Sequence, residues 1–182
     1  GDVYKRQRLG WENASECMVL VELLNALRLS RIALHARTGK QQYKGHPDLE
    51  AFQGFYELCQ HPLYYNGGIE SLSDIRQILI RFPLLKGVFI GRGLLSSPLL
   101  AKEFKGNETF LPEQRMSIYF AFHEELFSAY SQVLQGETQL LVKMKTLWEY
   151  FLPETDRKLL KRIKKSTRLQ QYTESVKAIF TS

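Results

Sequence analysis

Residues 31–35, RIALH, form a short apolar run that ends in a histidine. Two similar runs follow along the chain, PLYY at 62–65 and GVFI at 87–90. Each run is too short for a typical helix and is apolar on both faces, which is typical of strands buried within a parallel sheet. We therefore expect three parallel strands in the first half of the chain.

Helical patterns separate these strands. One covers about residues 14–27 and the next about 49–59. A third opens at Ser71, with Asp74 three residues later as a variant capping box. Strands that recur roughly every 25–30 residues, each followed by a helix, predict consecutive βα units.

The second half of the chain has a different pattern, because no strand signal follows Lys105. Four helical patterns follow instead, at about 112–135, 138–151, 156–166 and 170–180. We predict an α/β domain over residues 8–107 and a small helical bundle over 108–182. Five aromatic residues fall in the first of these helices and are expected in its core: Tyr119, Phe120, Phe122, Phe127 and Tyr130.

The first seven residues, GDVYKRQ, do not show the apolar pattern of a buried strand. They also lack the apolar segment of a secretory signal. We interpret residues 1–7 as a leader that is non-native or derived from sequence assembly, joined to a truncated chain.

Composition excludes several classes of protein. The chain has 182 residues, 44% of them hydrophobic, and no apolar run long enough to span a membrane. Its two cysteines, Cys17 and Cys59, are far apart, so we expect no disulfide framework, no metal site and a cytoplasmic location. The net charge of +6 permits an RNA partner without requiring one.

Polar and glycine-rich segments follow all three predicted strands, where ligands bind in parallel α/β folds. Glycine there lets backbone N–H groups approach a phosphate. Each glycine pair alone is more often a simple turn, and a single histidine at a strand end is more often structural. Together the loops favour a phosphate site, and its candidate residues are His35, Asn66, Gly67, Gly68, Gly91 and Arg92.

A basic segment spans residues 157–168. At helical spacing its seven lysines and arginines fall within an arc of roughly 160°, opposite Leu159, Leu160 and Ile163. The segment is either a solvated basic face or a surface that neutralises RNA phosphates.

Four segments of the chain form a recognisable series: RLGWEN at 8–13, LHARTGKQQYKG at 34–45, YYNGGIES at 64–71 and GVFIGRGLLSSPLL at 87–100. Together they resemble the second half of the tRNA-dihydrouridine synthase family. The order and spacing of the four carry the resemblance, which covers residues 8 to about 105.

The resemblance implies a fold and an activity. The fold is the C-terminal part of an eight-stranded (β/α) TIM barrel, followed by a helical domain that binds tRNA. The activity is reduction of a flipped-out tRNA uridine to dihydrouridine by FMN, with NADPH as the reductant, and we expect the complete protein to be a monomer. In this interpretation His35 contacts the flavin, and the loops at 66–68 and 91–92 hold its phosphate. The groups expected to face RNA are Arg37, Lys40, Lys44, Lys161, Arg162, Lys164 and Lys165.

This chain departs from the family pattern at several positions. Ala36 replaces a glycine, Gly39 stands where a basic residue is common, and Gly68 replaces an aspartate. Position 6 is arginine where the family has lysine, and the segment with the proton-donating cysteine is absent. We therefore expect a truncated and inactive synthase. The alternatives are another FMN-binding barrel oxidoreductase acting on a small molecule, or a non-catalytic RNA-binding helical module.

Overall fold

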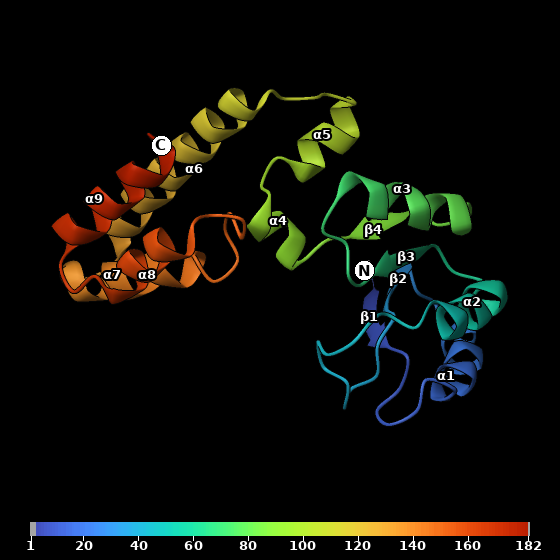
Figure 1. Cartoon of the computed structure of the whole chain (residues 1–182). Coiled ribbons are helices and arrows are strands. Elements are labelled where there is room, and N and C mark those ends of the chain that lie inside the picture. Colours follow the sequence, from blue (N-terminus) through green and yellow to red (C-terminus); the bar gives the residue numbers. More distant parts are fainter. Residues whose placement is uncertain (1–2, 182) are drawn as a thin grey trace. The chain divides into compact units, whose positions relative to one another are not determined.

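The computed structural model describes residues 3–181, and the chain divides into two compact units. The first ends at Gly93 and the second begins at Leu94. All strands of the described residues lie in the first unit (Figure 1).

A four-stranded parallel sheet forms the centre of the first unit. Its strands are β1 (Tyr4–Arg8), β2 (Arg31–His35), β3 (Leu63–Asn66) and β4 (Gly87–Phe89), in that order across the sheet. The register pairs Arg8 with His35, His35 with Asn66, and Asn66 with Phe89. The carboxyl ends of all four strands therefore stand in one row.

Three helices connect the strands: α1 (Glu16–Asn25), α2 (Leu49–Leu58) and α3 (Leu72–Arg81). Figure 1 shows them on the same side of the sheet. The side chain of Asp48 caps α2, and the predicted capping box of Ser71 and Asp74 is present at α3. The core between helices and sheet contains fully buried aromatic and branched side chains, among them Ile32, Leu34, Phe52, Phe55, Tyr65 and Ile75.

The prediction that residues 1–7 contain no strand is wrong, because Tyr4–Gln7 belong to β1. Residues 1 and 2 lie outside the described residues. The side chains of Tyr4, Lys5 and Arg6 are exposed, so this edge strand lacks an apolar pattern. Backbone hydrogen bonds to β2 fix the position of β1. The pattern of apolar and polar side chains gives no sign of such bonds.

All regular secondary structure in the described part of the second unit is helical. After the short helix α4 (Arg92–Ser96), which crosses the division, come α5 (Leu100–Gly106), α6 (Pro112–Val133), α7 (Gly136–Leu147), α8 (Arg157–Lys165) and α9 (Leu169–Phe180). Their core includes Tyr119, Met144, Trp148, Phe151, Ile163 and Tyr172. Phe120, Phe122, Phe127 and Tyr130 pack against that core, which confirms the packing role predicted for the aromatic residues of α6.

The division between the units lies earlier than the predicted boundary at 107/108. Leu99 is part of the helical core, and the hydroxyl groups of Ser97 and Tyr119 are 2.8 Å apart. The buried carboxylate of Glu103 forms an ion pair with Arg115. These contacts join residues 97–103 to α6, and they depend on tertiary packing that sequence pattern does not reveal.

Among the described residues no helix is long and apolar enough to cross a membrane. In the same part of the chain, no three His, Cys, Asp or Glu side chains gather as a metal site would need.

Candidate functional site

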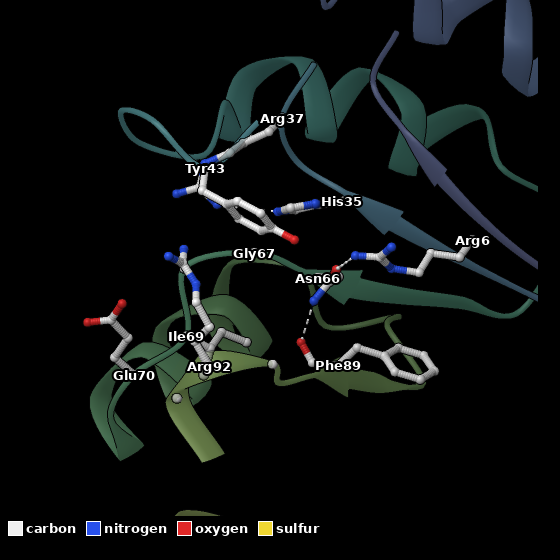
Figure 2. A pocket seen from close by; sticks show the side chains of 13 residues that line it. Arg6, His35, Arg37, Tyr43, Asn66, Gly67, Ile69, Glu70, Phe89 and Arg92 are labelled. Carbon is white, nitrogen blue, oxygen red and sulfur yellow. Dashed lines mark hydrogen bonds between the residues drawn. The ribbon is translucent and has the colours of Figure 1, made fainter. Parts of the chain in front are cut away.

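The row of strand ends in the first unit borders a pocket of about 130 Å³ (Figure 2). All six residues predicted to hold a phosphate line it: His35, Asn66, Gly67, Gly68, Gly91 and Arg92. The parallel register brings them together although they come from three loops. The lining also contains Arg37, which was expected to face RNA, and residues that sequence reasoning did not select, including Arg6, Tyr43, Ile69, Glu70 and Phe89.

Glycine is required at two lining positions because of backbone conformation. Gly67 has φ +137° and Gly68 has φ +60°, values that other residues rarely adopt. A Cβ atom at Gly68 would also lie 2.9 Å from the Pro47 ring. At Gly91, in contrast, a Cβ would meet nothing within 4 Å, so the backbone there borders open space that a ligand can approach.

His35 is 3% exposed at the end of β2. Its Nε2 lies 3.3 Å from Nη1 of Arg37, and since a guanidinium only donates, Nε2 accepts and Nδ1 carries the hydrogen. Within residues 3–181, Nδ1 has no hydrogen-bond partner. Burial, followed by repulsion from Arg8, Arg37 and other nearby arginines, lowers the pKa of His35 to about 4. At neutral pH the ring is therefore neutral and presents an unpaired N–H donor.

Arg37 is also buried, although the family resemblance suggested that it faces RNA together with Lys40 and Lys44. Its Nη2 donates to the carbonyl of Gly45 at 3.0 Å, while its Nε is buried and unpaired in the described chain. Burial lowers the pKa of this guanidinium. Lys40 is exposed and paired with Glu12, and Lys44 is exposed, so neither joins Arg37 in the pocket.

Asn66 connects three strands at the floor of the pocket. Its Oδ1 accepts from Arg6 of β1 at 3.1 Å, and its Nδ2 donates to the carbonyl of Phe89 in β4 at 2.7 Å (Figure 2). Both ends of the amide are therefore engaged within the protein. This residue ties the strand ends together, and its amide keeps one further N–H and one further lone pair in the pocket lining.

Tyr43 and Arg92 approach each other at the pocket (Figure 2). Cζ of Arg92 lies 4.5 Å from the centroid of the Tyr43 ring, and Cζ of Arg8 lies 5.7 Å from it. A ring face attracts cations, so Tyr43 can hold two guanidinium groups near each other at the rim. Tyr43 lies in the family-like segment at 34–45, and that motif was the signal that could have identified it.

The donor set of the pocket suits an anion. Three arginines line it, Arg6, Arg37 and Arg92, against one carboxylate, Glu70. Within residues 3–181, two buried side-chain atoms lack a hydrogen-bond partner, His35 Nδ1 and Arg37 Nε, and both are N–H donors that acceptor oxygens of a ligand would satisfy. A volume of about 130 Å³ is below the roughly 300–1,000 Å³ of typical cofactor pockets. It fits a phosphate group and not a whole flavin nucleotide.

The sequence matches a family profile described as dihydrouridine synthase (Dus) over residues 2–181. The chain belongs to the dihydrouridine synthase family. The matched range includes the whole of β1 and every helix of the described part of the second unit.

Curated relatives carry the same family name. A probable tRNA-dihydrouridine synthase of Aquifex aeolicus is 35% identical over 98 residues, 54% of this chain and 30% of the relative. One from Rhizobium leguminosarum is 33% identical over 94 residues, 51% of this chain and 29% of the relative. The tRNA-dihydrouridine(16) synthase of Escherichia coli is 27% identical over 106 residues, 58% of this chain and 33% of the relative. The chain thus spans about 30% of the length of the curated relatives it matches.

Neither cysteine of this dihydrouridine synthase chain lines the pocket. Cys17 is buried in α1 with its Sγ 3.6 Å from the carbonyl of Ala51, and Cys59 follows α2. Burial raises the pKa of both thiols. Both are therefore weak nucleophiles and poor acids at neutral pH.

The predicted basic face of α8 is exposed in the second unit, while Ile163 on the opposite side is fully buried. Lys161, Arg162 and Lys165 line a groove of about 400 Å³ together with residues of α9. Lys164 is exposed outside that groove. The four cations of α8 that were predicted to bind RNA are thus exposed to solvent on one helix.

Proposed function

We propose that this chain is part of an FMN-dependent tRNA-dihydrouridine synthase, and that the strand-end pocket holds the phosphate of FMN. This proposal rests on two features of one pocket: two buried N–H donors without a hydrogen-bond partner, and a lining rich in arginine and glycine. Such a lining stabilises a bound phosphate dianion, whereas the unpaired donors destabilise the pocket when no ligand is bound. FMN would supply hydride transfer, recharged by NADPH.

The roles of individual residues follow from their positions. Arg92 at the rim and Arg37 in the wall would contact phosphate oxygens, and the backbone at Gly91 would allow close approach. The Nδ1–H of His35 would donate to an oxygen of the cofactor. Asn66 would keep the strand ends aligned.

The four-stranded sheet would continue into a TIM barrel in a longer protein. Within the described residues, β1 and β4 are both edge strands, so each has an unpaired backbone side on which a barrel could continue. The flavin ring would then lie against walls that these 182 residues do not supply. For the same reason, and because Cys17 and Cys59 are remote from the pocket, this chain alone would not reduce uridine.

We assign tRNA as the partner of the exposed basic face of α8, where Lys161, Arg162, Lys164 and Lys165 would neutralise phosphates. Such contacts position the RNA without reading its sequence.

The test of the FMN assignment is the Arg92→Ala variant. Loss of a charge-assisted hydrogen bond to phosphate should weaken FMN binding about 10- to 100-fold, measured by equilibrium dialysis. The matched control is Arg76→Ala, since Arg76 is an exposed arginine of α3 outside the pocket. Equal FMN affinity of the two variants would contradict the assignment.

A further inference from the structure

Trp11 is a large aromatic side chain that the proposed FMN site does not use. It is 65% exposed in the loop that follows β1, three residues beyond Arg8. Its six-membered ring lies against Gly39, because a Cβ atom there would be 2.4 Å from Cε3 and 2.9 Å from Cζ3 of Trp11. The indole therefore packs against Gly39 and is exposed to solvent over most of its surface.

The loop that carries Trp11 is held firmly by hydrogen bonds. The N–H of Gly39 donates to the carbonyl of Gly10 at 2.7 Å, and the N–H of Lys40 donates to the carbonyl of Trp11 at 2.9 Å. The carboxylate of Glu16 accepts from three consecutive N–H groups, those of Trp11, Glu12 and Asn13, at 2.8, 3.0 and 2.7 Å. An exposed aromatic ring on such a loop loses little further freedom when it binds a ligand.

The surroundings of Trp11 suit a nucleic acid. The ring borders a groove of about 840 Å³ that contains Arg8 and Gln42 and extends along β1 to Val19 and Leu20 of α1. Arg8 stands at the carboxyl end of β1, where the register aligns it with His35 of the anion pocket. The Glu16 carboxylate in this groove is already engaged by the three N–H groups, so it repels an anion less than a free carboxylate would. An open aromatic face beside arginine is the arrangement on which proteins stack unpaired bases.

We propose that Trp11 is a stacking platform for an unpaired nucleobase of RNA bound along the carboxyl edge of the sheet. This inference rests on the proposed function, since it concerns the RNA that a dihydrouridine synthase would hold. Gly39 is part of the platform, because a side chain at this position would displace the indole from its seat.

Tryptophan fluorescence of the 182-residue chain tests the proposal. The sequence has two tryptophans, and Trp148 is 2% exposed with its Nε1 bonded to Tyr172. Before RNA is added, Trp11 should be quenched by acrylamide and Trp148 protected. A single-stranded oligoadenylate should then quench Trp11, whereas an abasic phosphodiester oligomer of equal length should not. Trp11→Phe should remove the quenched signal and leave that of Trp148.

Two variants measure the contribution of the platform. Trp11→Ala should weaken oligoadenylate binding about 5- to 100-fold, the range for removal of one stacked base. Gly39→Val should weaken it similarly while both indoles remain, and its backbone conformation is open to other residues because its φ is not positive. The control is Ile80→Ala, since Ile80 is an exposed apolar residue on α3.

Three results would overturn the proposal: equal quenching by the abasic oligomer, unchanged affinity of Trp11→Ala, or an indole of Trp11 already shielded from acrylamide without RNA. The last result would mean that protein covers the ring. Because Trp11 does not line the FMN pocket, Trp11→Ala should keep the FMN affinity of the unmodified chain. Failure of the stacking proposal is therefore distinguishable from failure of the FMN proposal, which Arg92→Ala tests.

Discussion

The titration of His35 reports how strongly burial and the nearby arginines disfavour a positive charge on this ring in the strand-end pocket. Burial and the surrounding arginines lower its pKa from 6.5 to about 4. At about 1.4 kcal/mol for each pH unit, the pocket disfavours the charged ring by about 3 kcal/mol. Sulfate, which stays a dianion over this range, is a simple probe for the phosphate group.

We expect saturating sulfate to raise the pKa of His35 by about one to three pH units, because an opposite charge within a few ångströms favours the protonated ring. By linkage, sulfate must then bind more tightly as the pH falls below neutrality, by about tenfold for each pH unit of that rise. The stabilised species is the protonated histidine, so the gain develops as the pH falls from the pKa of the complex, about 5–7, toward the pKa of about 4 without sulfate.

The assay is a histidine side-chain NMR titration with and without sulfate. His46, which is exposed and outside the pocket, reports the general effect of salt. A His35→Gln variant should bind sulfate with much less dependence on pH. The reasoning is refuted if sulfate moves the pKa of His35 no more than that of His46, or if the variant keeps the full pH dependence.

Two further predictions concern the helical unit. Tyr172→Phe removes the oxygen that accepts from Trp148 Nε1 at 2.9 Å and lies 2.6 Å from His123 Nε2. It should lower the free energy of unfolding by about 2–5 kcal/mol, because two buried polar groups lose their partner. Urea unfolding measures this change, with Tyr130→Phe as the control. A decrease no larger than that of the control would contradict the prediction. In a complete enzyme, we expect glutamine at Lys161, Arg162, Lys164 and Lys165 of α8 to weaken the binding of all tRNAs to a similar extent. The slope of log affinity against log salt concentration should fall by roughly 0.7–0.9 for each RNA phosphate that is no longer neutralised, with FMN content unchanged. Filter binding of tRNA at several salt concentrations measures this slope. An unaltered slope would mean that the basic face formed by Lys161, Arg162, Lys164 and Lys165 has no role in RNA binding.

The strands and glycine loops of the first unit could be predicted because their signals are local. The run at 31–35 forms β2 with the predicted bounds, and the loops at 66–68 and 91–93 line one pocket. Parallel pairing places consecutive strand ends at one edge, so the grouping of six candidate residues followed from topology alone. The roles of those residues stay predictions until a ligand is measured.

Features that depend on distant contacts could not be predicted. Arg37 is buried, and its guanidinium donates to the carbonyl of Gly45 and to the ring of His35, whereas the family resemblance implied that it faces RNA. Arg6 reaches Asn66 across 60 residues of sequence, and Leu99 joins the helical core. Each of these positions is decided by packing partners that no local pattern reports.

The aligned row of strand ends constrains how this unit can change in length. Successive side chains of a strand point to opposite faces, so one residue inserted within β2 or β3 would turn His35 or Asn66 toward the other face of the sheet. A residue inserted in the turn before β3 or β4 does not reverse the faces of the strand, but it must preserve the hydrogen bonds that tie Gln60 and His61 to α1 and Leu84 to Tyr56. Insertions in these turns are therefore expected to disturb the pocket less than insertions within the strands.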